Sequence, residues 1–430
     1  MKTVSIAEVF KMRFVDVYGQ YEKNKLTCEE AAEILGISIS TFYRKRQIYE
    51  EEGNNCILDR RAGRISPHRA ADAEVEFITE LFEDRYKDFS VRHFYDFAKH
   101  EHNVSRSYGW VKNKLIETGL VEKSNRGGKH RLRRERKPMA GMMLHQDGSK
   151  HRWIPALDYD LDLIVTMDDA TSKITSCFLV EEEGTFSTFR GLYETIKQEG
   201  IFCSLYTDRG SHYFYTPKVG GKVDKSRVTQ VGYALRQLGI RHIAAYSPQA
   251  RGRSERMFGT LQNRLPKELA MYNITSIEEA NKYIQEKYVS RHNEQFCVKP
   301  ASSEKAFLPW VSVVALEDIL CLKEHRISQH DNTVRYKGFI LQIPKNDYRH
   351  HYIKAEVTVH EYFDHQLAIF YGPLCIGRYD ANGELKSDEI KDAKIVKKAR
   401  VLRKNAELNN AEVATYYKVN YFGNNNAYAA

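Results

Sequence analysis

The strongest constraint on the fold is the order of predicted elements between residues 142 and 272. Three strand-like segments come first, MMLHQDGSKHRWI, LDLIVTMDDATSK and ITSCFLVEEE, and the second is strongly apolar. They are followed by a helix over 185–199, a strand in IFCSLYTD, a helix over 227–238, a strand in IRHIAAYS and a long helix over 252–272. Three strands, a helix and then alternating strands and helices predict a mixed α/β sheet.

The segments on either side of this α/β region have different patterns, so we predict a multidomain chain. A chain of 430 residues is too long for one compact core. The preceding residues have helical patterns, and the period-two alternation after Pro309 predicts a small C-terminal β-barrel. The predicted boundaries are 1–62 for an N-terminal helix-turn-helix domain, 63–122 for a second helical, winged-helix-like domain, 123–139 for a basic linker, 140–308 for the α/β core, 309–382 for the barrel, and 383–430 for a basic helix and a disordered tail.

Two helices joined by a tight turn are predicted between residues 27 and 51. Thr27 and Glu30 have the capping-box spacing at the start of the first helix, and Gly36 ends it. As a helix-turn-helix, this unit would bind DNA and present to the major groove the residues Thr41, Tyr43, Arg44 and Gln47. Many helical hairpins share the pattern without touching DNA, so a purely structural unit remains the alternative.

A second pair of helices is predicted over residues 91–118, with Arg106 and Lys112 as candidate DNA contacts. A plain helical bundle is the alternative interpretation. The segment that follows, residues 123–137, contains eight Lys or Arg against one acid, in a chain whose net charge is +9. Its Arg131, Arg133 and Arg134 are candidate phosphate contacts. A solvated linker would have the same composition.

Three acids occur at chemically suggestive places in the α/β region. Asp147 lies in the first predicted strand, Asp208 ends a later strand, and Glu255 lies near the start of the long helix. Carboxylates suit Mg²⁺ or Mn²⁺, and three of them can hold two ions for phosphoryl transfer. Asp147, in the central strand, is best placed to bridge both ions. Each acid alone has an alternative role, as a turn residue or at a helix N-terminus, and Asp168 and Asp169 are rival ligands for which we predict a turn role.

The motifs around these acids resemble the DDE transposases of bacterial insertion sequences, which belong to the retroviral-integrase superfamily. The segments that carry the resemblance are HQDGS, MDDATSKI, TDRGSH and AYSPQARGRSERMFGTLQ. The resemblance implies a ribonuclease H-like core over residues 140–308 and assigns metal binding and catalysis to Asp147, Asp208 and Glu255. Many relatives have about 35 residues between the last two acids, whereas 46 intervene here, as in the ISNCY-type subgroup.

Further residues near Glu255 are candidate DNA contacts. Arg251 and Arg253 would bind phosphates, or else neutralise buried acids. Gln262 lies seven residues after Glu255 and shares its helical face, so it is also expected to contact DNA.

The predicted function is therefore an insertion-sequence transposase that binds double-stranded DNA as a dimer or larger assembly and joins a 3′-hydroxyl to target DNA. No GxxxxGK[ST] loop occurs, so no nucleotide cofactor is expected. No apolar run is long enough to span a bilayer, and seven dispersed cysteines without a CxxC pair predict reduced thiols in a cytoplasmic, nucleoid-associated bacterial protein. The alternatives are a DNA-binding regulator without cleavage activity and a general ribonuclease H-like nuclease.

Overall fold

A computed structural model describes residues 6–53, 70–123, 135–217, 223–224, 226–246, 248–312 and 314–386, with the side chains of 6–7 and 248–251 left undescribed. The chain divides into two compact units, Met1–Leu81 and Phe82–Ala430, which are described separately. Three predictions fall outside the described residues: the phosphate contacts Arg131, Arg133 and Arg134, the tail beyond residue 386, and the side chain of Arg251.

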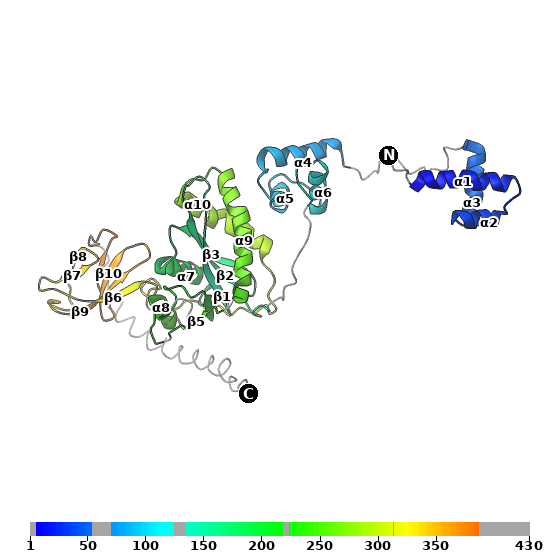
Figure 1. The fold of residues 1–430 in the computed structure, drawn as a ribbon. Coiled ribbons are helices and arrows are strands. Elements are labelled where there is room, and N and C mark those ends of the chain that lie inside the picture. The colour runs from blue at the N-terminus through cyan, green and yellow to red at the C-terminus, as the bar shows by residue number, and fades with distance from the viewer. Residues whose placement is uncertain are drawn as a thin grey trace, which may run out of the picture. The chain divides into compact units, whose positions relative to one another are not determined.

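The first unit contains helices α1 (Ile6–Glu22), α2 (Cys28–Leu35) and α3 (Ile39–Glu52), labelled in Figure 1. The capping box predicted from Thr27 and Glu30 is present, and Gly36 ends α2 in the left-handed region at φ 65°. The three helices enclose an aromatic core in which the rings of Phe14 and Phe42 lie 5.9 Å apart. The two predicted helices are therefore present, whereas their role in DNA recognition remains a prediction.

The next helices along the chain are α4 (Asp72–Arg85), α5 (Val91–His100) and α6 (Tyr108–Glu117). Serine side chains cap the last two, since Ser90 and Ser107 each accept a hydrogen bond from a backbone N–H in the first turn. Helix α5 buries one face almost completely, including Phe94 and Ala98. Its amphipathic pattern therefore forms a packed surface.

The central sheet consists of β1 (Leu144–His151), β2 (Leu161–Asp168), β3 (Ile174–Val180), β4 (Ser204–Thr207) and β5 (Arg241–Ala244). Their order is β3-β2-β1-β4-β5. The first three strands are antiparallel, while β4 and β5 run parallel to β1. The predicted mixed α/β sheet is confirmed, and this order fits a ribonuclease H-like core.

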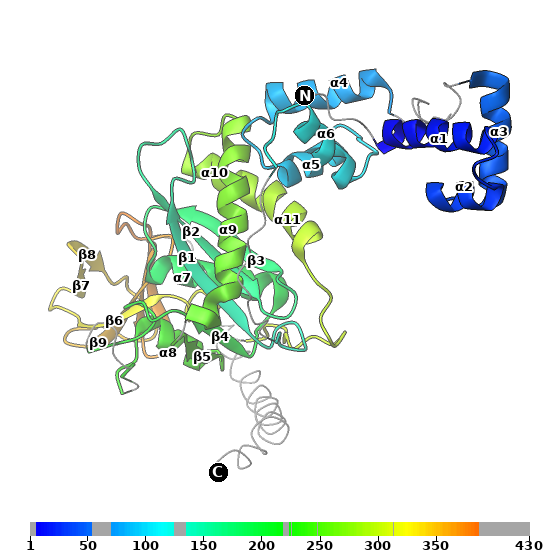
Figure 2. The ribbon, with the colours of Figure 1, turned by 45° about the vertical axis from the view of Figure 1, so that its right-hand side comes forward.

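Helices cover both faces of this sheet (Figures 1 and 2). On one face, α7 (Thr185–Glu199) and α8 (Gln230–Gln237) pack with Leu144 and Leu205. On the other face, α9 (Pro248–Met271), α10 (Ile277–Tyr283) and the π-helix η2 (Ile284–Tyr288), which continues into α11 (Val289–Phe296), enclose alternate residues of β2, among them Leu163 and Val165. Both faces of β2 are therefore buried, which explains its nearly continuous apolar sequence.

Two asparagine side chains cover the exposed edge of the sheet at β3. Asn293 accepts a hydrogen bond from the Ile174 N–H at 2.8 Å and donates one to the Ile174 carbonyl at 2.9 Å. Asn281 does the same at Leu179, at 2.6 and 3.0 Å. Each amide takes the place of a neighbouring strand, so these edge positions are closed to pairing with another chain.

Helix α5 contacts the α9 side of the core through buried polar groups. His93 Nε2 lies 2.7 Å from Glu268 Oε1 on α9, and both side chains are almost fully buried. Tyr283 OH donates to the other oxygen of Glu268 at 2.7 Å, and Arg291 also pairs with that oxygen. Burial lowers the pKa of His93, so a neutral ring donates to the Glu268 side chain.

The C-terminal strands do not form the predicted closed barrel. Among the described residues, β11 (Leu374–Tyr379), β10 (Leu367–Tyr371), β9 (Glu356–Glu361) and β6 (Leu322–Ile327) form a four-stranded sheet in that order, and β7 (Thr333–Tyr336) pairs only with β8 (Phe339–Gln342). The β7–β8 hairpin instead packs its Val334 and Leu341 side chains into the core of the four-stranded sheet. The period-two pattern predicted strands, and strands are present, but closure depends on pairing the two edge strands, which such a pattern does not specify.

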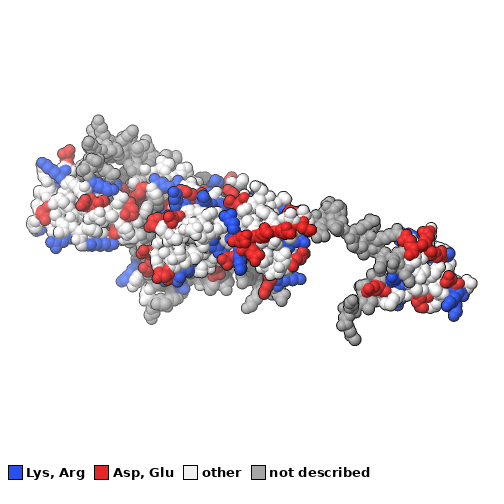
Figure 3. Space-filling view, turned by 90° about the horizontal axis from the view of Figure 1, so that it is seen from above, with Lys and Arg blue, Asp and Glu red and all other residues white. Residues whose placement is uncertain are grey.

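No helix in the described part of the chain is long and apolar enough to cross a membrane. In the view of Figure 3, Lys and Arg side chains are interspersed with Asp and Glu over most of the surface, and the most conspicuous region of one sign is a short acidic band. The positive net charge is therefore not concentrated on the described surface seen in this view.

Candidate active site

Asp147 lies in the middle of the central strand β1 and is 8% exposed. It pairs with Val165 of β2, whose side chain belongs to the core beneath α9. Because residues directly opposite one another point to the same face of a sheet, Asp147 projects toward the α9 side.

Asp208 follows directly after β4, which runs parallel to β1. The paired residues of the two strands are Leu144 with Leu205 and His145 with Tyr206. Extending this register by two residues sets Asp147 opposite Asp208, on strands about 4.8 Å apart. The carboxylate of Asp208 is oriented by its turn, because Oδ1 accepts a hydrogen bond from the Gly210 N–H at 2.8 Å.

Helix α9 carries Glu255 and is fixed to β1 at two points. Arg253 pairs with Asp169, which also contacts His145 at the start of β1. Gln262 donates to Ser149 farther along the strand at 3.1 Å. Nine helical residues span about 13.5 Å and four strand residues span about 13 Å, so the helix and the strand run side by side in the same direction.

Because α9 and β1 run side by side, the position of Glu255 along the strand axis can be compared with that of Asp147. It lies about 3 Å along α9 from Arg253, and Asp147 lies about 6.6 Å along β1 from His145, so the two acids differ by about 4 Å in height. Glu255 also shares the helix flank of Gln262, seven residues later, which contacts the face of β1 that bears Asp147. The Glu255 side chain is exposed. Among the described residues, no group of three His, Cys, Asp or Glu side chains is close enough together to hold a metal ion.

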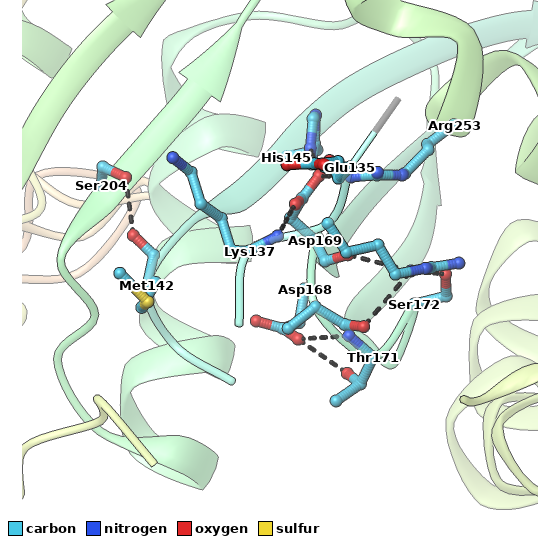
Figure 4. A network of polar contacts seen from close by, with 12 residues as sticks. Glu135, Lys137, Met142, His145, Asp168, Asp169, Thr171, Ser172, Ser204 and Arg253 are labelled. Carbon is cyan, nitrogen blue, oxygen red and sulfur yellow. Dashed lines mark hydrogen bonds and ion pairs between the residues drawn. The ribbon is translucent and has the colours of Figure 1, made fainter. Parts of the chain in front are cut away.

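The rival acids Asp168 and Asp169 have structural partners (Figure 4). Asp168 accepts hydrogen bonds from the Thr171 N–H at 2.8 Å and the Thr171 hydroxyl at 2.7 Å, and from the Gly141 N–H at 2.9 Å. It therefore stabilises the turn between β2 and β3, as predicted.

Asp169 has a different environment, because it is buried among donors. Its oxygens contact the Lys137 N–H at 2.8 Å, His145 Nε2 at 2.8 Å, and Arg253. Burial alone would raise the pKa of Asp169, but the hydrogen bonds from His145, Lys137 and Arg253 outweigh it and hold that pKa well below its usual range. Asp169 is thus an ionised anchor for α9, and Arg253 pairs with it, while a DNA contact of Arg253 remains a prediction.

A second group of polar side chains beneath Asp147 was not anticipated from the sequence. The carboxylate of Glu183 lies so close to Gly148 that a Cβ there would be 2.3 Å from its Oε2. His212 Nε2 is 3.5 Å from Glu183 Oε1, and the adjacent Tyr213 is fully buried. Burial raises the pKa of Tyr213, and Glu183, Asp147 and Asp208 add to the effect, so the phenol stays protonated. A run of three glutamates at 181–183 gave no signal that singled out Glu183.

The predicted DNA contacts outside the core differ in exposure. Tyr43, Arg44 and Gln47 are exposed on α3, whereas Thr41 is half-buried and bonds the cap residue Ser38. Arg106 lies over the ring of Trp110 at 5.2 Å, and Lys112 is half-buried on α6. The three α3 side chains are accessible from solvent, but Gln47 donates to Glu51 at 3.1 Å and would have to leave that contact, as Arg106 would have to leave Trp110.

Sequence comparison relates the chain to transposases. It is 28% identical over 359 residues to "Putative transposase y4bF" of Sinorhizobium fredii, an alignment that covers 83% of this chain and 77% of that protein. It is 28% identical over 309 residues to the transposase for insertion sequence IS1202 of Streptococcus pneumoniae, covering 64% of this chain and 66% of the relative. No family model matches the chain.

Comparison with solved structures gives partial superpositions. The simian T-cell lymphotropic virus intasome covers 70% of this chain and 98% of its own, at 13% identity and a TM-score of 0.31. The catalytic core domain of HTLV-2 integrase in complex with magnesium covers 35% and 88%, at 16% identity and a TM-score of 0.26. TM-scores this low carry no argument, so the fold rests on the strand order described above.

Proposed function

We propose that this homologue of insertion-sequence transposases is a DDE-type DNA transposase, a polynucleotidyl transferase that cleaves DNA at the ends of its element and joins the freed 3′-hydroxyl to target DNA. One observation supports the proposal. The parallel pairing of β1 with β4, extended by two residues beyond His145 and Tyr206, would set Asp147 beside Asp208, on the sheet face that lies under the helix bearing Glu255. Two acids that are 61 positions apart in the sequence would thereby lie on neighbouring strands at the centre of the sheet.

The oxygen donors of these acids fit a divalent cation. Asp147 and Asp208 supply carboxylate oxygens, which are hard ligands suited to Mg²⁺ or Mn²⁺. Glu255 would complete a set for two ions by turning its exposed side chain toward β1. When bound, two such ions activate the attacking oxygen and stabilise the leaving oxygen of an in-line displacement.

The chain's own residues position these acids. Asp169 and Arg253 hold the first turns of α9 against β1, and Gln262 repeats the attachment two turns after Glu255. The Gly210 N–H orients the Asp208 carboxylate. This support fixes the backbone from which each acid extends, which is the condition for a preorganised site.

The remaining parts are proposed to recognise DNA. The exposed α3 residues Tyr43, Arg44 and Gln47 would read the terminal repeats of the element. Two element ends must be joined, so a dimer or larger assembly on DNA is expected. A DNA-binding regulator without cleavage is the alternative function, and it would not need the acids to converge.

The test is strand transfer by the full chain, with Mg²⁺ or Mn²⁺ and a donor DNA that carries the sequences flanking its gene. Asp147→Asn keeps the shape of the side chain and removes its charge, and should abolish joining while leaving DNA binding intact. Asp158→Asn changes an exposed acid in the neighbouring β1–β2 loop and is the matched control. Equal joining by the two variants would exclude Asp147 from catalysis, and DNA binding without any joining by the parent would favour the regulator.

A further inference from the structure

A cavity of about 520 Å³ lies between α8 and the C-terminal sheet, away from the carboxylates. Its walls come from three parts of the chain: the start of α8, the segment that leads into β6, and one face of β6, β9 and β10. The lining residues that matter here are Gln230, Tyr233, Lys323, His325, His360 and Phe370. Its volume is in the range of small-ligand sites, about 300–1,000 Å³.

The sheet face in this cavity is polar and basic, whereas the opposite face holds the apolar core of the C-terminal sheet. Strand pairing sets Lys323 opposite His360 and His325 opposite Thr358, so all four point to the same side. Phe370 pairs with Thr358 and extends this face onto β10. The alternation along these strands therefore produces a cationic surface interleaved with an aromatic ring.

Lys323 is the lysine of this cavity, and its half-buried ammonium group would be stabilised by a bound anion. Its Nζ donates to Gln237 at 3.1 Å and lies 5.6 Å from the centre of the Tyr233 ring. Burial lowers the pKa of Lys323, and the charge of Asp318 offsets only part of that effect. Asp318 itself accepts a hydrogen bond from the Tyr362 hydroxyl at 2.5 Å and pairs with Arg378 at 3.7 Å. A partly desolvated ammonium is stabilised by an incoming phosphate.

The rim of the cavity exposes apolar surface that a base can cover. Tyr233 is 48% exposed, and beside it Val228 is 41% and Val314 50% exposed. Within the cavity, the His360 ring stacks on Phe370 at 4.1 Å and is 7% exposed. Its Nδ1 makes no hydrogen bond to any described residue. An aromatic rim beside cations and an unpaired imidazole nitrogen offers stacking, a phosphate contact and a polar contact for a base edge.

We propose that this cavity binds one unstacked nucleotide of a DNA strand, with its base on Tyr233 and its phosphate at Lys323 and His325. The proposal rests on the proposed function, since a transposase meets DNA whose bases are locally unpaired at the cut ends. Duplex DNA does not fit, because its bases are stacked within the helix and cannot reach an aromatic side chain in a cavity. A free mononucleotide has the same chemistry, so the experiment must separate the two sources.

The experiment uses the full-length protein and a twelve-residue oligothymidylate with one central 5-iodouracil. Irradiation should crosslink the base to Tyr233 or Phe370, and peptide mass spectrometry locates the bond. Fluorescence anisotropy of the same oligonucleotide should show Tyr233→Ala weakening binding by about five- to a hundredfold, the range for loss of one stacked base. Tyr348→Ala removes another exposed tyrosine, 43% exposed and outside the cavity, and should leave the affinity unchanged.

Salt dependence gives a readout that a folding defect does not mimic. Lys323→Met should reduce the slope of log affinity against log salt by about 0.7, the value for one phosphate contact on a single strand. An unchanged slope, crosslinks confined to other surfaces, or equal effects of the two tyrosine variants would each overturn the proposal. Thymidine monophosphate that competes as tightly as the oligonucleotide would overturn the assignment to a DNA strand.

The outcome does not depend on catalysis. Asp147→Asn should bind and crosslink as the parent does. If the parent crosslinks at Tyr233 but joins no DNA in any divalent metal, the proposed function fails and the cavity assignment stands. If the parent joins DNA but no crosslink forms at this cavity, the proposed function stands and the cavity assignment fails.

Discussion

Replacing Asn293 by alanine tests whether side-chain amides really close the edge of the central sheet. The substitution removes both partners of Ile174, the acceptor at 2.8 Å and the donor at 2.9 Å. Ile174 is 1% exposed, so water does not readily replace them. Two buried backbone groups left without partners should cost about 2–4 kcal/mol.

Hydrogen exchange of the Ile174 amide is the appropriate assay, because a multidomain chain need not unfold in one step and local opening is what the amide reports. A cost of about 2–4 kcal/mol corresponds to exchange about 30- to 700-fold faster. Asn293→Asp sharpens the test, since it keeps the acceptor for the N–H but sets an oxygen against the Ile174 carbonyl. It should also destabilise the edge, while Asn113→Ala, an exposed position on α6, should not. An Ile174 amide that exchanges less than about fivefold faster in Asn293→Ala would refute the reasoning.

Other perturbations test the packing around the candidate site. Gly148→Ala should lower stability by at most about 1 kcal/mol in thermal unfolding, because its Cβ would displace the Glu183 carboxylate, which is the end of a flexible and partly exposed side chain. Adding Glu183→Ala should restore the loss, and no rescue would place the clash elsewhere. Glu268→Gln should lower the free energy of unfolding by about 3 kcal/mol, since it leaves the half-buried Arg291 without its carboxylate. The control Glu286→Gln changes an exposed glutamate and should have little effect, and similar losses in the two variants would argue against a buried ion pair. Burial lowers the pKa of His292 to about 4 and that of His360 to about 3, so between these values and about 6.5 the unfolded chain binds more protons. Stability should therefore fall as the pH decreases below about 6.5, by at most about 1.4 kcal/mol per pH unit for each ring, and His360→Gln should flatten that dependence in urea titrations at pH 7, 6 and 5; an unchanged slope would show that His360 is not neutral in the folded chain.

The five strands and helices α7, α8 and α9 could be predicted because their hydrophobic periods are clear, whereas α10, η2 and α11 were not predicted. The relation between Asp147 and Asp208 could not be derived in this way, because it depends on β4 inserting beside β1 rather than beside β3. The turn role of Asp168 followed from its local sequence, whereas the burial of Asp169 among His145 and Arg253 joins three distant segments. For the same reason the C-terminal strands were predicted but their pairing was not. Domain boundaries and the DNA contacts of α3 remain predictions.

Helix α9 connects the candidate active site with helix α5, because it carries Glu255 near its start and Glu268 about 20 Å farther along. At the first end, Arg253 ties it to Asp169 and hence to β1. At the other, Glu268 binds His93 of α5, the helix that begins the second predicted recognition unit. A buried hydrogen bond to a carboxylate adds modest net stability but is costly to leave half-formed, so this contact specifies where α5 lies more than it strengthens the fold. If α5 belongs to a DNA-recognition unit, as the sequence predicts, its movement would act directly on the helix that carries Glu255.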